Sequence, residues 1–197
     1  MTPEKPRRWP LSAPLAALAV LASPLLGACL EVDGLEYTID LASHTGHLTV
    51  HGIGSSSEAE EAADFTELIE QYVGANALDG AGVHWGIQAW TVRAKRLVDA
   101  DPHLDGAIDF AWTRPLDVGL FAHDRAHPTA WCPPTGFFVT RANATFRTRE
   151  GCLVWGAGVT TLRIEIQSEK AGMGRALRAR WRAAPPAPGG VRGAVDG

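Results

Sequence analysis

The sequence is poor in the residues and patterns that usually identify a biochemical activity. Its 197 residues include three cysteines, two methionines and two tyrosines. Three cysteines exclude a disulfide-dense miniprotein, while a hydrophobic content of 46% excludes a wholly disordered chain. The chain contains no Cys-x-x-Cys, Gly-x-Ser-x-Gly or His-Glu-x-x-His pattern, so the common redox, hydrolase and zinc-peptidase signatures are missing. Composition and motifs therefore assign no reaction and no cofactor.

An excess of positive charge is lacking as well. The formal net charge is −4, and it is distributed unevenly over three segments. Residues 1–28 carry three basic residues and one acidic residue, and residues 171–197 carry five arginines and one aspartate. Residues 29–170 therefore hold a net charge of about −10. An acidic body lacks the basic face that binds phosphates, which argues against nucleic acid as a partner.

Long hydrophobic runs are confined to the N-terminal region. An apolar run from Leu11 to Leu26 spans about 16 residues, whereas a transmembrane helix needs ~20. Pro14 and Pro24 interrupt this run, and basic residues precede it. Residues 1–28 are therefore interpreted as a cleaved secretory signal peptide rather than as a membrane span.

The apolar run ends in Leu26-Gly27-Ala28-Cys29. This tetrapeptide resembles the lipobox of bacterial lipoproteins, in which a leucine and two small residues precede a cysteine. The resemblance implies cleavage before Cys29 and acylation of its sulfur, so that the lipid bilayer becomes a partner; two acyl chains anchor a protein stably. It also implies a place in the cell envelope, with Leu30 favouring the outer over the inner membrane. The alternative is an ordinary signal peptide with a chance cysteine.

The pattern of residues 29–170 predicts one α+β domain, with a mainly antiparallel sheet and one amphipathic helix packed on it. Apolar and polar residues alternate over 35–43 and again around 48–50, which predicts a β-hairpin over 35–52. Ser57 and Glu60 form a capping-box pattern, and helical spacing of apolar residues follows as far as a stop at Gly74.

The remainder of this domain shows mostly strand patterns. Alternation predicts strands over 83–98, 108–112 and 162–166, and turn pairs separate the first two at Asp101-Pro102 and Asp105-Gly106. In the last strand Arg163, Glu165 and Gln167 are expected to point outward. Strand-like residues on both sides of Ala142-Asn143 predict a second hairpin over 137–146. In the first of these strands Trp85 and Trp90 have opposite parity, so that either one is exposed as a binding residue for a glycan or protein, or both pack in the core.

Cys132 and Cys152 are the two cysteines that remain after lipidation. Exported proteins meet an oxidising compartment, where an even number of cysteines indicates a disulfide. Closing a loop of about 20 residues contributes ~3 kcal/mol in the chain-entropy model. Two buried thiols are the alternative interpretation.

Two histidine-rich segments are the candidate binding sites. His44 and His47 flank the expected hairpin turn, and His123, Asp124 and His127 lie near Trp131 in an irregular segment. Imidazole binds metals and transfers protons near neutral pH, but the spacings complete no recognisable metal site. Solvated loop and turn histidines are the alternative for both segments, and no metal is assigned.

Residues 171–197 combine arginine, glycine and proline, a composition that predicts a disordered tail. The body resembles uncharacterised lipoproteins of myxobacterial type in its lipobox, its hairpin-helix opening, Asp117-Val118-Gly119-Leu120 and its paired cysteines. That resemblance implies no activity. The leading hypothesis is a lipid-anchored, non-catalytic module that binds or scaffolds another envelope protein or a glycan. The rival is a metal-dependent or hydrolytic envelope enzyme that uses the histidine-rich loops.

Overall fold

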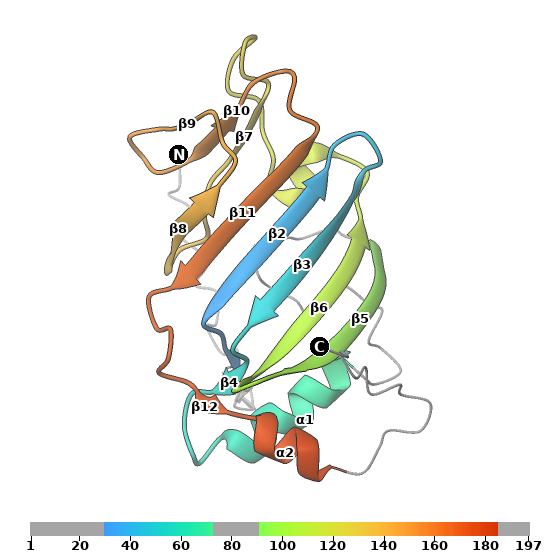
Figure 1. Cartoon of the computed structure of the whole chain (residues 1–197), viewed down its shortest axis with the longest axis vertical. Helices are drawn as coiled ribbons and strands as arrows, with labels where there is room; N and C mark the ends of the chain where they lie inside the picture. Colours follow the sequence, from blue (N-terminus) through green and yellow to red (C-terminus); the bar gives the residue numbers. More distant parts are fainter. Residues whose placement is uncertain (1–29, 73–90, 185–197) are drawn as a thin grey trace, which may run out of the picture.

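The computed structural model describes residues 30–72 and 91–184 (Figure 1). Its main element is an antiparallel six-stranded sheet with the order β5-β6-β3-β2-β11-β8. Its strands are β2 (Gly34–Asp40), β3 (Thr45–His51), β5 (Thr91–Ala100), β6 (His103–Ala111), β8 (Phe137–Ala142) and β11 (Thr161–Ser168). The expected α+β domain, mainly antiparallel, is confirmed. Predictions that concern residues 1–29, Trp85, Trp90 and residues 185–197 lie outside the described residues.

The hairpin β2–β3 confirms the sequence prediction and forms the centre of the sheet. Its register runs from the pair Gly34 and His51 to the pair Asp40 and Thr45. The Asp40 carboxylate accepts hydrogen bonds from the backbone N–H groups of the next turn residues, at 3.0 Å and 2.7 Å. Strand β11 pairs with the other side of β2, and β6 pairs with β3.

Alternation along the strands buries one face of the sheet and leaves the other outside the core. The inward side chains of the central strands are almost completely buried: Leu35, Tyr37, Ile39, Leu48, Val50, Ile108, Phe110, Leu162, Ile164 and Ile166. Most of their neighbours in sequence are polar and point the opposite way, because successive side chains of a strand face opposite sides. The core therefore lies on one side of the sheet.

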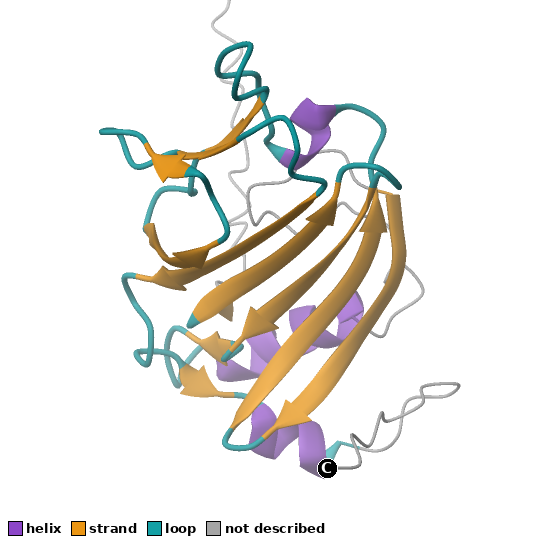
Figure 2. Cartoon of the chain, turned by 45° about the horizontal axis from the view of Figure 1, so that its top comes forward, coloured by secondary structure: helices purple, strands orange, loops and turns teal. Residues whose placement is uncertain are grey.

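Helix α1 (Glu61–Tyr72) covers part of the inner face, and Figure 2 shows it behind the sheet. Ser57 Oγ accepts a hydrogen bond from the backbone N–H of Glu60 at 3.3 Å, as the capping pattern predicts. Leu68 is fully buried, and Phe65 and Ile69 pack against the core. The expected core-facing helix is confirmed within the described residues.

A second small sheet lies at the upper end of the molecule in Figure 1 and has the order β7-β10-β9. Its strands are β7 (Thr129–Trp131), β9 (Phe146–Arg147) and β10 (Leu153–Trp155). The expected disulfide joins Cys132 and Cys152, next to the pairing of β7 with β10, with a Cα–Cα distance of 4.2 Å. The 3₁₀-helix η2 (Pro115–Val118) precedes this sheet.

The predicted hairpin over 137–146 is wrong. Strand β8 pairs with β11, whereas β9 pairs with β10 in the small sheet. Asn143 fixes this departure, because its Oδ1 accepts hydrogen bonds from Trp155 Nε1 at 3.0 Å and from the backbone N–H of Arg163 at 2.8 Å. Its Nδ2 donates to the carbonyl of Thr161. The chain at Asn143 is therefore tied to other strands and does not form a tight turn.

The expected turn at Asp105-Gly106 is also wrong, because both residues lie within β6. Asp105 accepts a hydrogen bond from the backbone N–H of Gly52 at 2.9 Å, and Gly106 pairs with Val50 on β3. These long-range contacts outweigh the local turn preference. The hairpin turn between β5 and β6 lies instead at Asp101-Pro102, as the other turn pair predicts.

The structure departs from the predicted disordered tail over residues 171–184. Strand β12 (Arg175–Ala176) pairs with β4 (Gly54–Ser55), which also pairs with β1 (Leu30–Glu31). Helix α2 (Arg178–Ala183) follows, and Leu177 between them is fully buried. A buried leucine and a strand partner order this segment, which composition alone treats as solvated.

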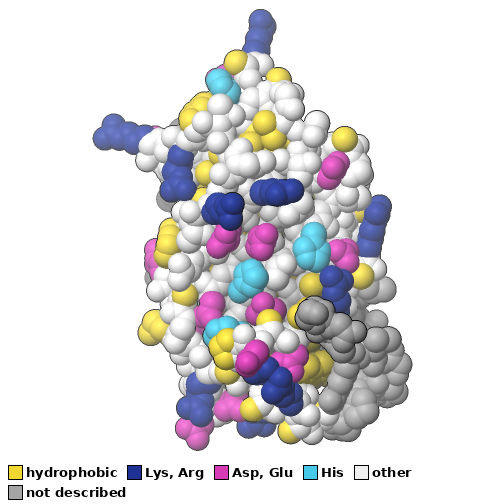
Figure 3. Space-filling model, viewed as in Figure 1, with side chains coloured by type: hydrophobic (Ala, Val, Ile, Leu, Met, Phe, Trp, Pro, Cys, Tyr) yellow, Lys and Arg dark blue, Asp and Glu magenta, His cyan; other side chains and the backbone are white. Residues whose placement is uncertain are grey.

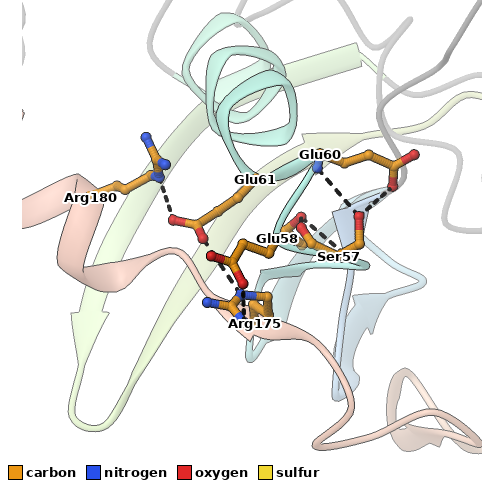
Figure 4. Close-up of polar contacts among 7 residues, drawn as sticks. Ser57, Glu58, Glu60, Glu61, Arg175 and Arg180 are labelled. Carbon is orange, nitrogen blue, oxygen red and sulfur yellow. Dashed lines mark hydrogen bonds and ion pairs between the residues drawn. The ribbon is translucent and has the colours of Figure 1, made fainter.

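Charge pairing explains why an arginine-rich segment folds onto an acidic body. Arg178 pairs with Asp99 and Asp101, and Arg182 pairs with Asp99 at 2.6 Å. Figure 4 shows the other half of this contact, in which Arg180 reaches Glu61 and Arg175 lies beside Glu58 and Glu61 at the start of α1. Hydrogen bonds from Arg182 and Arg178 lower the pKa of Asp99. These arginines are therefore engaged within the chain.

Candidate functional site

The outer face of the six-stranded sheet is the candidate site. Figure 1 looks onto this face, and within residues 30–72 and 91–184 no helix crosses its central strands. Figure 3 shows arginine, acidic and histidine side chains gathered over the middle of the face. Cross-strand register places them in rows, so that each row can be built from the pairing of the strands.

The first row contains a histidine held between a carboxylate and a hydroxyl. His47 Nδ1 lies 2.6 Å from Asp109 Oδ1, and His47 Nε2 lies 3.3 Å from Thr49 Oγ1. Arg96 donates to the second oxygen of Asp109 at 3.2 Å. Partial burial raises the pKa of Asp109, but the hydrogen bonds from His47 and Arg96 outweigh it, so the net pKa is lowered. Asp109 is therefore held as an anion that orients the imidazole.

A second histidine on the same strand has its own carboxylate. His51 Nδ1 lies 3.0 Å from Asp105 Oδ2, and His51 Nε2 lies 3.8 Å from Glu36 Oε2. The hydrogen bond to Asp105 raises the pKa of His51, and the charges of Asp105, Glu36 and Glu165 add to this effect against partial desolvation. His47 and His51 thus face separate partners, and within the described part of the chain no three such side chains group as metal ligands.

Beside these pairs a cavity of about 340 Å³ opens on the outer face between β8, β11 and β2. Register places Arg141 opposite Glu165, and Glu165 opposite Glu36. A β-bulge between Glu165 and Ile166 shifts the pairing of β11 with β8 at this point. β-Bulges often occur beside functional sites, where they change the direction in which a side chain points. The complete lining is Glu36, Arg141, Ala142, Asn143, Arg163, Ile164 and Glu165.

The histidines that flank the first turn do not form a pair. The His44 ring stacks on Trp112 with a centroid distance of 4.3 Å, while His47 bonds to Asp109. His44 also has a positive φ of 54° at the turn and accepts a hydrogen bond from the backbone N–H of Trp112 through its carbonyl. Its neighbours hold it in a structural position.

The second histidine segment is brought together by the fold. Asp124 accepts hydrogen bonds from the backbone N–H of His127 at 2.7 Å and from its Nδ1. The His123 and His127 rings both contact the Phe146 ring, with centroid distances of 5.8 Å and 5.0 Å. Trp131 does not join them, because it is buried and packs on Tyr37 at 5.8 Å. Trp131 is thus a core residue and not a surface binding residue.

Sequence reasoning missed the carboxylate partners of the sheet histidines, Asp105 and Asp109. No local pattern connects them, since they lie 54 and 62 residues away from His51 and His47. The alternation of β11 did indicate that Arg163 and Glu165 point outward. The alternation of side chains along a strand was therefore the one sequence signal for this site. The strand order, which brings Arg141 and Glu36 to the same cavity, could not be predicted from the sequence.

Comparisons with protein-family models, with curated proteins and with solved structures found no match for this chain. The site must therefore be interpreted from its own geometry.

A separate search found no helix of membrane-spanning length and hydropathy among the described residues.

The raised pKa of His51 predicts a pH-dependent stability. Because the pKa of His51 is higher in the folded than in the unfolded state, its protonation stabilises the fold. This stabilisation is fully present below the pKa of the unfolded state, ~6.5, and is lost as the pH rises through the pKa of the folded state. Between pH 6 and pH 9 the free energy of unfolding of the wild type should fall by up to ~1 kcal/mol more than that of a His51→Gln variant. The difference is small because the His51 side chain is 41% exposed and solvent screens its pair with Asp105. Urea denaturation at both pH values measures this difference. Gln167→Ala on the same face should keep the wild-type profile, and equal profiles for wild type and His51→Gln would contradict the assignment.

Proposed function

We propose that the protein is a lipid-anchored cell-envelope module that binds a ligand of mixed charge, without catalysis, through the outer face of its sheet. The observation that supports it is the concentration of arginines, carboxylates and histidines on a sheet face that no described helix crosses. A rigid sheet presents such side chains in fixed positions, which favours recognition. The opposite face is occupied by the core.

Two features of the chain support the anchor. The first is the lipobox resemblance that ends at Cys29. The second is the closeness of the folded domain to that cysteine, because β1 begins at Leu30 and the long strand β2 begins at Gly34. An anchor on Cys29 would place the domain within a few residues of the bilayer, for which outer-membrane attachment is the favoured case.

The anchor is tested by a Cys29→Ser substitution in the full chain. We expect this variant to lose incorporation of labelled fatty acid and to leave the membrane fraction, since an acyl chain contributes ~0.8 kcal/mol per buried CH₂. Metabolic labelling and fractionation measure the two effects. The Cys132→Ser variant is the matched control and should keep the label. Unchanged labelling of Cys29→Ser would refute the anchor.

The binding face is tested by photo-crosslinking in the intact cell envelope. A photoreactive amino acid at Thr38 or Gln167 lies on the outer face, whereas the same probe at Glu150 lies in the loop between β9 and β10. We expect a discrete adduct from Thr38 and Gln167 that is absent from Glu150. Adducts of equal yield at all three positions, or none from the sheet, would contradict the proposed face.

One observation favours a second candidate function, the hydrolysis of an ester or amide. Asp109, His47 and Thr49 form a continuous carboxylate–imidazole–hydroxyl arrangement, with distances of 2.6 Å and 3.3 Å. In this order a carboxylate orients the imidazole, and the imidazole can remove the proton of the hydroxyl nucleophile. The arrangement lies on an open sheet face, where solvent weakens the electrostatic stabilisation of a transition state, so binding is the better-supported function.

Hydrolysis of 4-nitrophenyl acetate separates the two functions. A hydrolase should release nitrophenol at a rate that falls ~100-fold or more in both His47→Gln and Thr49→Val, because loss of the general base or the nucleophile removes the same step. His51→Gln is the control, since His51 pairs with other carboxylates. A rate that these substitutions leave unchanged would eliminate the hydrolytic function.

A further inference from the structure

The charges around the sheet-face cavity differ from the other charged pairs of the same face. Asp109 is hydrogen-bonded to His47 and Arg96, and Asp105 is hydrogen-bonded to His51 and to the backbone N–H of Gly52. In those pairs donor and acceptor already meet, so a ligand would have to break them. They form the fixed part of the face.

The charged side chains that line the cavity are less fully paired. Among the described residues, the guanidinium groups of Arg141 and Arg163 and the carboxylate of Glu165 make no ion pair or side-chain hydrogen bond. The Glu36 carboxylate has the 3.8 Å contact with His51. Two cations and two anions therefore line one small volume without an ion pair among them. Such a site can bind a ligand without first breaking a strong pair.

Cross-strand pairing makes the arrangement of the two carboxylates unfavourable by itself. Glu36 and Glu165 lie directly opposite each other on β2 and β11. Like charges in directly opposed positions destabilise a sheet. A cation placed between them would remove that repulsion, which the 3.8 Å contact of His51 with Glu36 relieves on one side only. The pair thus favours an ammonium group.

The guanidinium groups of Arg141 and Arg163 favour a carboxylate on the same ligand. Guanidinium binds carboxylate in a planar, bidentate geometry, and two such groups line the cavity. A ligand with negative charge alone would meet the repulsion of Glu36 and Glu165, and a metal cation would meet the two arginines. The lining therefore selects a molecule that carries both signs.

Hydrogen bonds hold one side of the cavity in place, which favours a single orientation of the ligand. Three of the four hydrogen-bonding positions of the Asn143 amide are occupied, by Trp155, Arg163 and Thr161, so the end of β8 is fixed against β11. The volume of about 340 Å³ is at the small end of the range for ligand pockets and suits a molecule the size of one or two amino acids.

We infer that this cavity binds a small zwitterion of the amino-acid or dipeptide class, with its carboxylate on Arg141 and Arg163 and its ammonium group between Glu36 and Glu165. The inference rests on the proposed function and names the ligand class of its binding face. The ligand bridges β8, β11 and β2, and its two charges supply the partners that Arg141, Arg163 and Glu165 lack among the described residues.

The experiment uses the full chain in detergent and three matched probes, namely glycylglycine, N-acetylglycylglycine and glycylglycinamide. The first carries both charges, the second lacks the ammonium group and the third lacks the carboxylate. Calorimetric or NMR titration should show saturable binding of glycylglycine and binding at least about tenfold weaker for the other two, because each loses one charge-assisted contact. Equal binding of all three, or tighter binding of either analogue, would overturn the inference.

Variants locate the site. Arg163→Gln and Glu165→Gln should each weaken glycylglycine binding by about tenfold. The control is Arg149→Gln, an exposed arginine in the loop between β9 and β10 and outside the cavity, which should bind like wild type. Both cavity side chains are exposed, so the fold should persist, and melting curves check this. Wild-type affinity in both cavity variants would overturn the site. Absence of glycylglycine binding with the Thr38 and Gln167 crosslinks intact removes this inference alone, whereas loss of those crosslinks removes the proposed binding face.

Discussion

The one-sided burial of the six-stranded sheet is the constraint on which the rest of the structure depends. Leu35, Tyr37 and Ile39 on β2 are almost completely buried, and the residues between them point the other way. Because a strand alternates its side chains, a core on one face obliges the chain to present its polar residues on the other. The charged outer face is thus the second consequence of the pattern that forms the core.

The charges on this outer face and at the C-terminal end differ in how fully they are matched. Arg178 and Arg182 pair with carboxylates of β5 and its turn, and Arg180 pairs with α1, so the arginine-rich segment stabilises the fold. On the sheet, His47 pairs with Asp109 and His51 pairs with Asp105. Among the described residues, Arg141, Arg163 and Glu165 at the cavity make no ion pair, which is why we propose the cavity, rather than the histidine turn, as the binding site.

Much of the fold could be predicted from periodicity, and its failures have a common cause. The β2–β3 hairpin, the helix after Ser57 and the last long strand were predictable because local alternation and capping specify them. The hairpin over 137–146 and the turn at Asp105-Gly106 failed where long-range hydrogen bonds to Trp155, Arg163 and Gly52 overrode local preference. The prediction of disorder over residues 171–184 failed for the same reason. Leu177 is buried in the core, and the arginines near it pair with carboxylates far away in the sequence.

Local sequence patterns were enough to predict the α+β class and the parity of the central strands, and they favoured a Cys132–Cys152 disulfide over two free thiols. They also placed Arg163 and Glu165 on the outward face, because parity is a local property of a strand. Tertiary structure decided which strands are neighbours, and so brought Arg141 and Glu36 to the same cavity and Asp109 to His47. Strand order depends on the packing of residues that lie tens of positions apart, and no periodicity within one segment encodes it.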